Sequence, residues 1–330
     1  LTVAWQNLIH ALPIFGILSD LLGFRRIALL GGVVYGAGLW LASHSETALG
    51  LYTNLGGVVG IGIGLSGMIV VMGAVGQVAP PERRSTAFGL VTVAFSIGMF
   101  IMAPMLQYMI NLYGWSGALQ ASGGLVLIIS VLALGLPGNT SKTKKSNDSE
   151  TASELNLLKT INGAMNHSGY LLLNIGFFVC GFHVAFIGTH LPSFLQSEGI
   201  SINTASWALA MIGLFNMFGS MIFGRMGDSL SKKNLLSLLY TLRAVVIAGF
   251  LAIPLNEITA IAFGAAIGFL WLATVPLTSG IVAQVFGTRY LSTLWAIVFF
   301  SHQLGAFLGV WLGGRAVSYT HLTLPTNREV

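Results

Sequence analysis

The sequence has 330 residues, of which 55% are hydrophobic and only 8% are charged, with a formal net charge of +5. Its mean hydropathy is +0.82. Soluble domains contain about 25% charged residues, so this chain lacks the charges that cover a water-facing surface. We predict an all-α integral membrane protein. The basic residues do not form one patch, which excludes nucleic acid as the expected partner. The one cysteine, Cys180, rules out an intrachain disulfide.

Ten apolar stretches follow one another along the chain. A helix needs about 20 residues to cross the hydrocarbon core of a bilayer. The predicted membrane helices lie at 1–17, 27–43, 50–77, 86–110, 117–136, 169–195, 204–223, 234–253, 257–284 and 291–314. The 42 glycines suit helices that pack closely in lipid, because small residues let backbones approach.

The basic residues between these helices predict the orientation. Cytoplasmic loops retain lysine and arginine. Alternate loops contain twelve such residues, namely Arg25, Arg26, Arg83, Arg84, Lys142, Lys144, Lys145, Lys159, Arg225, Lys232, Lys233 and Arg289. The other loops, at 44–49, 111–116, 196–203 and 254–256, contain none. We therefore expect the basic loops to be cytoplasmic, in a multi-pass protein of the inner (plasma) membrane.

The two halves of the chain repeat each other around a polar segment. Residues 138–160 are polar, serine-rich and of mixed charge, which predicts a flexible linker. With an offset of 208 residues, Gly16 overlays Gly224, and Asp20 overlays Asp228. Internal repeats are typical of secondary transporters. The predicted domains are an N-terminal bundle at 1–137, a cytoplasmic linker at 138–168 and a C-terminal bundle at 169–316.

The repeated loop resembles a motif of the major facilitator superfamily. The residues that carry the resemblance are Gly16, Leu18, Asp20, Gly23, Arg25 and Arg26, and the weaker copy is at 224–233. The resemblance implies two pseudo-symmetric bundles of six helices, of which helices two to eleven are visible. Leu21 and Phe24 stand where the family often has basic residues.

We predict a gating role for this motif and for Gly224 and Asp228. A carboxylate at a helix end beside arginines forms a charge-assisted pair, which could hold the cytoplasmic ends of the bundles together in one conformation. The glycines permit a tight turn and close approach. The alternative is that Asp20 caps its helix and that Arg25 and Arg26 only fix the topology.

Two further segments resemble monocarboxylate and oxalate-type members of this superfamily. They are "PERRSTAFGLVTVA" at 81–94 and "GFFVCGFHVAFIGTHLPSFL" at 176–195. Members with anion sites carry a basic residue on helix eight, where this chain has Asn216. The resemblance implies a small organic anion as substrate, and Asn216 departs from it.

Arg243 lies in the middle of the apolar segment 234–253. A charge at that depth costs roughly 2.5–3.5 kcal/mol on insertion scales, so a partner or a function is needed. Every carboxylate in the sequence falls in a loop, at a helix end or in the tail. Arg243 either supplies positive potential to an anionic substrate or has a structural role, since helix nine of this superfamily often packs outside the cavity.

Other polar residues within the predicted helices are also candidates for the substrate site. His183 and His190 are seven residues apart and share one helix face, and His302 lies beside Gln303. A histidine can carry a coupled proton, or it can simply hydrogen-bond across a helix interface. Trp271, Thr274 and Thr278 share a face of the tenth helix of the family, where Trp271 could contact substrate or only pack.

Catalysis is not expected. The "GLSG" at 64–67 matches an intramembrane serine protease motif around Ser66, but the repeat and the ten helices favour a transporter. The chain lacks a phosphate-binding Gly-x-x-x-x-Gly-Lys motif. Residues 317–330 resemble a translated sequencing adapter, so we predict a non-native tail and set it aside. We expect helices one and twelve of the family to be missing from this sequence.

The predicted function is secondary active transport by alternating access. The expected substrate is a small organic anion such as a monocarboxylate, moved by symport with a proton through a prokaryotic monomer in the lipid bilayer. No cofactor or metal is predicted. The alternatives are export of neutral or amphipathic compounds and a transporter-like sensor.

Overall fold

The computed structural model describes residue 6 and residues 8–137 and 149–323, and all of the elements that it describes are helices. Nine helical segments in these residues are long and apolar enough to cross a membrane, and a tenth, Leu8–Leu22, is apolar but shorter. Nine of the ten predicted stretches are therefore found as helices, and the shorter helix covers the described part of the first. The beginning of the first predicted helix, the linker residues 138–148 and the tail residues 324–330 lie outside the described residues.

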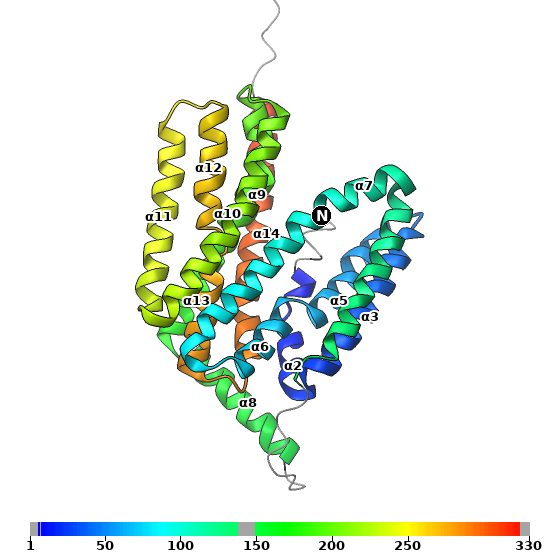
Figure 1. The fold of residues 1–330 in the computed structure, drawn as a ribbon, viewed down its shortest axis with the longest axis vertical. Coiled ribbons are helices and arrows are strands. Elements are labelled where there is room, and N and C mark those ends of the chain that lie inside the picture. The colour runs from blue at the N-terminus through cyan, green and yellow to red at the C-terminus, as the bar shows by residue number, and fades with distance from the viewer. Residues whose placement is uncertain (1–5, 7, 138–148, 324–330) are drawn as a thin grey trace, which may run out of the picture.

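The helices form two bundles that meet at one end of the molecule and diverge at the other (Figure 1). The N-terminal bundle contains α2 (Ile14–Leu22), α3 (Phe24–Ser43), α4 (Ala48–Leu51), η1 (Tyr52–Val58), α5 (Val59–Ser66), α6 (Met68–Val78), η2 (Pro81–Arg83) and α7 (Arg84–Ala133). The π-helix η1 continues α4 into α5, and α7 covers two predicted spans with a kink at Gly114, whose φ is 69°.

The C-terminal bundle follows the helix α8 (Ser149–Met165). It contains α9 (Ser168–Ser197), α10 (Ile202–Ser229), α11 (Lys232–Ala252), α12 (Glu257–Phe269), α13 (Thr274–Phe286) and α14 (Leu291–Thr323). Side chains cap several of these helices: Ser201 accepts from Thr204 N–H, and Asn256 and Thr259 form a capping box at α12.

The linker differs in part from the prediction, because residues 149–160 belong to α8 and are not flexible chain. Leu157 and Ala164 of α8 are buried, which gives the helix an apolar face that the serine-rich composition conceals. In Figure 1, α8 lies at the end of the molecule where the bundles meet. We call this end the linker side and the other end the open side.

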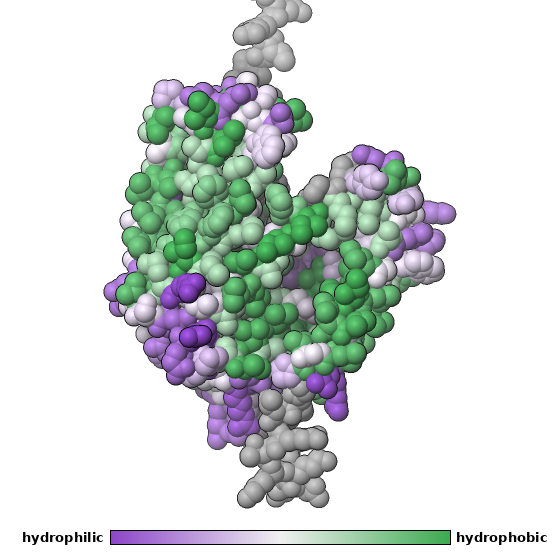
Figure 2. All heavy atoms as spheres, in the orientation of Figure 1, coloured by the Kyte–Doolittle hydropathy of each residue, from purple (hydrophilic) through white to green (hydrophobic). Residues whose placement is uncertain are grey.

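The surface agrees with a membrane protein. In Figure 2, apolar residues cover the flanks of both bundles, and hydrophilic residues gather at the two ends. Many large apolar side chains are exposed, among them Leu172, Val245 and Leu251 at 68%, 61% and 73%. The glycines pack as predicted: Gly36 and Gly123 face each other where α3 crosses α7, with no room for side chains.

Candidate substrate cavity between the two bundles

A cavity of about 940 Å³ lies between the bundles. Figure 2 shows the surface hollowed between the two halves of the molecule. Its walls come from both bundles and are mostly apolar, including Ile63, Val71, Phe95, Phe307 and Val310. Among the described residues that line it, none is Asp, Glu, Lys or Arg. The cavity has the size and the apolar walls of a small-molecule site.

Two interrupted helices face this cavity, one from each half of the chain. The first is interrupted at Gly67, between α5 and α6, and the second across residues 270–273, between α12 and α13. The 208-residue offset of the repeat overlays Gly67 on Val275, so the interruptions occupy nearly equivalent positions. Residues at both interruptions line the cavity, including Ser66, Gly67, Trp271 and Leu272. Interrupted helices in corresponding positions of two repeats are typical of transporter binding sites.

The cavity lining contains a group of three polar side chains, His10, His302 and Gln303. Gln303 Nε2 lies 3.4 Å from His10 Nε2, so this contact joins a residue of α14 to the segment that precedes α2. His302 is buried, with its ring 4.8 Å from Phe177 and stacked on Phe299 at 5.8 Å. Neither ring nitrogen of His302 has a hydrogen-bond partner in the described structure. Since buried polar atoms are normally paired, His302 has hydrogen-bonding capacity at both ring nitrogens that the described contacts leave unused.

The predicted site residues divide into two groups. Trp271, His302 and Gln303 line the cavity, whereas His183, His190 and Thr274 are outside its lining. His190 Nε2 lies 3.3 Å from the Val310 carbonyl oxygen of α14. Thr274 is fully buried, and its hydroxyl lies 3.4 Å from Cys180 Sγ. The spacing of His183 and His190 placed them on one face of α9, but Val184 and Gly188 face the cavity.

Sequence reasoning missed His10. This residue lines the cavity, its Nδ1 donates to the Gln6 carbonyl oxygen at 3.0 Å, and its ring packs edge-on against Phe299. Its polar side chain within the first apolar stretch was the available signal. Ser66 also lines the cavity, and its hydroxyl donates to Gly62 O of its own helix at 2.8 Å.

Arg243 lies behind the cavity wall, where it is 1% exposed. Its Nη2 donates to the carbonyl oxygens of Leu270 and Trp271 at 2.6 and 2.7 Å, and Nη1 lies 3.3 Å from Cys180 Sγ. Its guanidinium also lies 5.6 Å from the ring centroid of Tyr240. The charge is therefore compensated by backbone carbonyls.

Asp228 joins the two bundles on the linker side. It lies in the last turn of α10, and its carboxylate accepts from the backbone N–H groups of Ser85 and Thr86, at 2.8 and 3.0 Å, and from the Thr86 hydroxyl at 2.5 Å. These donors are at the N-terminus of α7, where unpaired N–H groups and the helix dipole favour an anion. Gly224 and Gly89 meet at the same crossing without room for side chains.

Asp20 makes the equivalent contact in the other half. Its Oδ2 accepts from the backbone N–H and the hydroxyl of Thr293, both at 2.8 Å, at the N-terminus of α14. Gly16, one turn earlier, packs against the Ser292 backbone, where a Cβ would collide. We call the contacts of Asp20 and Asp228 the two latches. Both are part of the N-terminal capping of a helix in the opposite bundle.

The expected pairing of Asp20 with the arginines is not what holds this loop. Arg25 is exposed, and its Nε donates to the Leu136 carbonyl oxygen at 3.1 Å within its own bundle. Arg26 is exposed as well. Gly23 has a φ of 92°, which glycine adopts without strain and which allows the turn between α2 and α3. The N-terminus of α14 is therefore the partner of Asp20 in place of an arginine.

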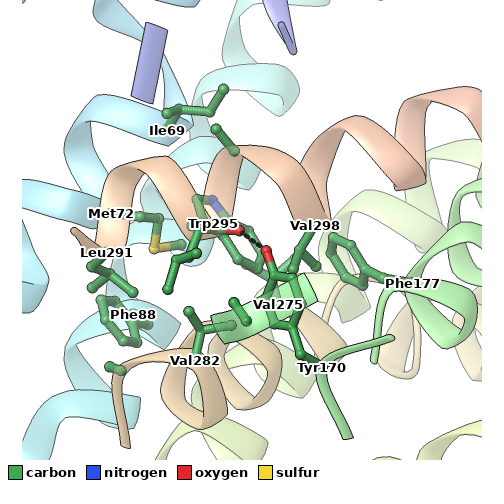
Figure 3. Packing of buried hydrophobic residues seen from close by; sticks show 14 of the residues in the cluster. Ile69, Met72, Phe88, Tyr170, Phe177, Val275, Val282, Leu291, Trp295 and Val298 are labelled. Atoms are coloured by element: carbon green, nitrogen blue, oxygen red, sulfur yellow. Dashed lines mark hydrogen bonds between the residues drawn. The ribbon is translucent and has the colours of Figure 1, made fainter. Parts of the chain in front are cut away.

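A buried apolar core closes the cavity on the linker side. In Figure 3, Trp295 and Val298 of α14 lie between Met72 and Ile69 of α6 and residues of α9 and α13. Phe88 of α7 belongs to the same cluster, so both bundles contribute. Tyr170 Oη donates to the Leu294 carbonyl oxygen at 2.8 Å, which fixes α9 against α14. Together with the latches, this core separates the cavity from the linker side.

Two pseudo-symmetric helical bundles around a central cavity, each with an interrupted helix, define a membrane carrier. The model of the Major Facilitator Superfamily matches residues 4–310. The chain belongs to this superfamily, as the repeated motif predicted.

Known relatives support the predicted resemblance to monocarboxylate-type members. The chain is 26% identical over 344 residues to monocarboxylate transporter 12 of Rattus norvegicus, a match that covers 93% of this chain and 70% of the relative. It is 24% identical to the uncharacterized MFS-type transporter YcxA of Bacillus subtilis, over 93% of this chain and 75% of that protein.

Solved structures share the fold. The Escherichia coli fucose:proton symporter FucP superposes with a TM-score of 0.73 at 13% identity, over 97% of this chain and 83% of that one. The human organic anion transporter MFSD10 superposes with a TM-score of 0.71 at 18% identity, over 94% of this chain and 75% of that one. At these identities the likeness concerns the fold alone.

Proposed function

We propose that this carrier moves a small organic anion, such as a monocarboxylate, together with a proton by alternating access. The substrate binds in the cavity against His10, Trp271, His302 and Gln303. The observation that carries the proposal is the group formed by the imidazoles of His10 and His302 and the amide of Gln303. They lie in a cavity whose described lining contains no Asp, Glu, Lys or Arg. Relatives named monocarboxylate transporters support the substrate class.

The chemistry of the cavity favours an anion that enters with a proton. A lone carboxylate in apolar surroundings loses its hydration without compensation. An imidazole that takes up a proton near neutral pH supplies a counter-charge, so carboxylate and proton enter as a neutral pair. His302 is the foremost candidate because both of its ring nitrogens lack partners. Gln303 and His10 offer further donors to the carboxylate.

The remaining predicted residues have an indirect role in this proposal. Thr274, His183, His190 and Arg243 belong to the wall behind the lining residues, and direct contact of any of them with substrate stays a prediction. In this conformation the latches and the apolar core close the linker side. The basic loops favour a cytoplasmic linker, and with that orientation the cavity opens outward, across the inner (plasma) membrane. One copy contains both bundles and works as a monomer.

Alternation requires that the two latches open. We propose that Asp20 and Asp228, with the close contacts at Gly16 and Gly224, hold the outward-open state and separate in the inward-open one. Gly23 allows the turn that positions Asp20, and Arg25 and Arg26 fix the cytoplasmic loop. Because each latch is a small, part-buried group of hydrogen bonds, each is worth about 1–2 kcal/mol, which a substrate can offset.

Uptake by the purified protein in proteoliposomes tests this function. Radiolabelled L-lactate and pyruvate are offered with and without an inward proton gradient, beside protein-free vesicles. We expect saturable uptake that the gradient accelerates. Saturable uptake that does not respond to the gradient would contradict proton coupling. Saturable uptake of neutral solutes alone would contradict an anionic substrate. Absence of flux of every solute offered would favour a sensor.

A second candidate is export of neutral or amphipathic compounds. The apolar lining, with Phe95, Phe299 and Phe307, favours it over transport of a strongly charged solute. Vesicles in which the protein has the opposite orientation, loaded with a lipophilic neutral dye, distinguish export of neutral compounds from uptake of an anion. Efflux of the dye without competition by L-lactate supports this alternative.

A further inference from the structure

We infer that Arg243 and Asn216 are positioning residues that hold the interruption between α12 and α13 and thereby present Trp271 to the cavity. We call residues 270–273 the α12–α13 break. The inference deepens the proposed function, because it assigns a role to two buried polar side chains that the proposed substrate site leaves unused. It does not require that either residue touch substrate.

The sequence explains why the helix is interrupted here. Pro276 is the third residue of α13 and has no N–H to donate to a carbonyl four residues earlier. The Leu272 carbonyl oxygen instead accepts from Val275 N–H at 2.9 Å. The carbonyls of Leu270 and Trp271 are therefore in a turn and not in a regular helical ladder. Buried carbonyls without partners are costly in an apolar environment.

Arg243 satisfies these two carbonyls. It approaches from α11 and donates to Leu270 O and Trp271 O at 2.6 and 2.7 Å. Its positive charge lies just beyond the C-terminus of α12, where the helix dipole favours a cation. A planar guanidinium can donate to two neighbouring oxygens from one side chain, which a lysine does less well. The burial of this arginine thus has a local cause in the break.

Asn216 holds the break from the opposite side. Its Oδ1 accepts from Leu272 N–H at 2.9 Å, and its Nδ2 donates to Ser96 Oγ at 2.7 Å. Asn216 and Ser96 are 4% and 2% exposed. Asn216 is on α10 and Ser96 on α7, so this asparagine also links the break to the other bundle. The position requires a side chain that both donates and accepts, as the Asn216 amide does. A basic side chain could not accept from Leu272 N–H.

The arrangement is specific to the C-terminal half. The offset of 208 residues overlays Tyr35 on Arg243, and the equivalent interruption at Gly67 has its N–H bonded within its own helix, to Ile63 O at 2.6 Å. Only the break that carries Trp271 has a buried cation among the described contacts. This asymmetry points to a role for the break in presenting Trp271 and not to a general need of interrupted helices.

Fluorine NMR of the protein labelled with 5-fluorotryptophan tests the inference without any transport assay. The chain has seven tryptophans, and the Trp271 resonance is assigned by its loss in Trp271→Phe. We expect Arg243→Gln and Asn216→Ala each to shift the Trp271 resonance by more than its linewidth. Tyr240→Phe is the matched control: it removes the 2.9 Å bond from the same helix to Gly176 O and leaves the ring in place.

The outcomes are decisive in either direction. A Trp271 resonance unchanged in either folded variant overturns the inference, as does a shift of equal size in Tyr240→Phe. If Arg243→Gln and Asn216→Ala both fail to fold while the control folds, the two residues are structural and the positioning role is also overturned. Parallel uptake of radiolabelled L-lactate should show a raised KM with a smaller change in kcat. Absence of lactate uptake by the unaltered protein would count against the proposed function only.

Discussion

Asp228 and Thr86 are 142 residues apart in the sequence and meet through two hydrogen bonds, one from the Thr86 backbone and one from its hydroxyl. Asp20 and Thr293 form the same pair of bonds in the other half. The offset of 208 residues overlays Thr293 on Ser85, the neighbour of Thr86, so the two latches are equivalent to within one residue. Each half supplies one aspartate at a helix C-terminus and one helix N-terminus that the aspartate of the other half caps.

Removal of both latches should shift the carrier toward the inward-open state. Loss of a capping carboxylate costs about 1 kcal/mol, roughly a fivefold change in a population ratio. The distance is measured between spin labels at Glu46→Cys and Glu257→Cys, both exposed at the open side. In the double variant Asp20→Ala with Asp228→Ala, a larger share of the molecules should have the shorter distance between the labels. Cys180 is buried and should not take up label.

Glu82→Ala is the control for this experiment. Glu82 is exposed in η2, close in sequence to the N-terminus of α7. Glu82→Ala therefore removes a carboxylate from the same region without removing a latch. Its distance distribution should match that of the unaltered protein. An unchanged distribution in the double latch variant would show that the latches do not determine the conformation.

A side chain at Gly16 should force the bundles apart on the linker side. A Cβ there collides with the Ser292 backbone and with Ala296 Cβ. Overpacking typically costs 1–3 kcal/mol, so Gly16→Val should lower the thermal unfolding temperature of the purified protein. Gly249→Val is the control, because a Cβ at Gly249 meets nothing within 4 Å. Equal unfolding temperatures for the two variants would contradict the close contact.

The sequence predicted the helices, the repeat and the superfamily, because composition and loop charge report directly on lipid and topology. It predicted the first helix at 1–17, whereas α2 continues to Leu22, so that Asp20 is in the last turn of a helix. It could not predict that Thr293 is the partner of Asp20. That contact joins helix ends 273 residues apart, and an arginine in the next loop was the more visible candidate.

The candidate site was predictable only in part. Trp271, His302 and Gln303 line the cavity as depth and polarity suggested. Helical spacing put His183 and His190 on one face without showing which face points to the cavity, since this depends on the packing of α9 against α14. The role of Arg243 stayed open because its carbonyl partners, Leu270 and Trp271, are exposed by a break that hydropathy does not reveal.

His302→Gln should uncouple uptake from the proton gradient. Glutamine keeps hydrogen-bonding groups but cannot take up a proton, so exchange of labelled for unlabelled L-lactate across the vesicle membrane should persist while gradient-driven accumulation is lost. His190→Gln is the control, because His190 is outside the cavity lining and bonds at Val310 O. Accumulation that survives in His302→Gln would assign the proton to another group.

Uptake should not depend on sodium. In many secondary transporters, carbonyls at interrupted helices bind the coupling sodium ion. Here the carbonyls of Leu270 and Trp271 are occupied by the Arg243 guanidinium. Replacement of sodium by choline on both sides of the vesicle membrane should leave the rate of L-lactate uptake unchanged. A steep dependence on sodium would show that a cation site exists elsewhere in the carrier.

The central claim is that transport requires the two bundles to separate on the linker side. A reversible cross-link tests it most directly: a Cβ at Gly227 would lie 3.1 Å from Ser85 Cβ, a few tenths of an ångström less than the roughly 3.5–4.5 Å separation in a disulfide. With Ser85→Cys and Gly227→Cys, oxidised protein should lose L-lactate uptake and regain it on reduction, while each single variant is insensitive to oxidant. Full uptake by protein whose cross-link is verified by peptide mass spectrometry would contradict the claim.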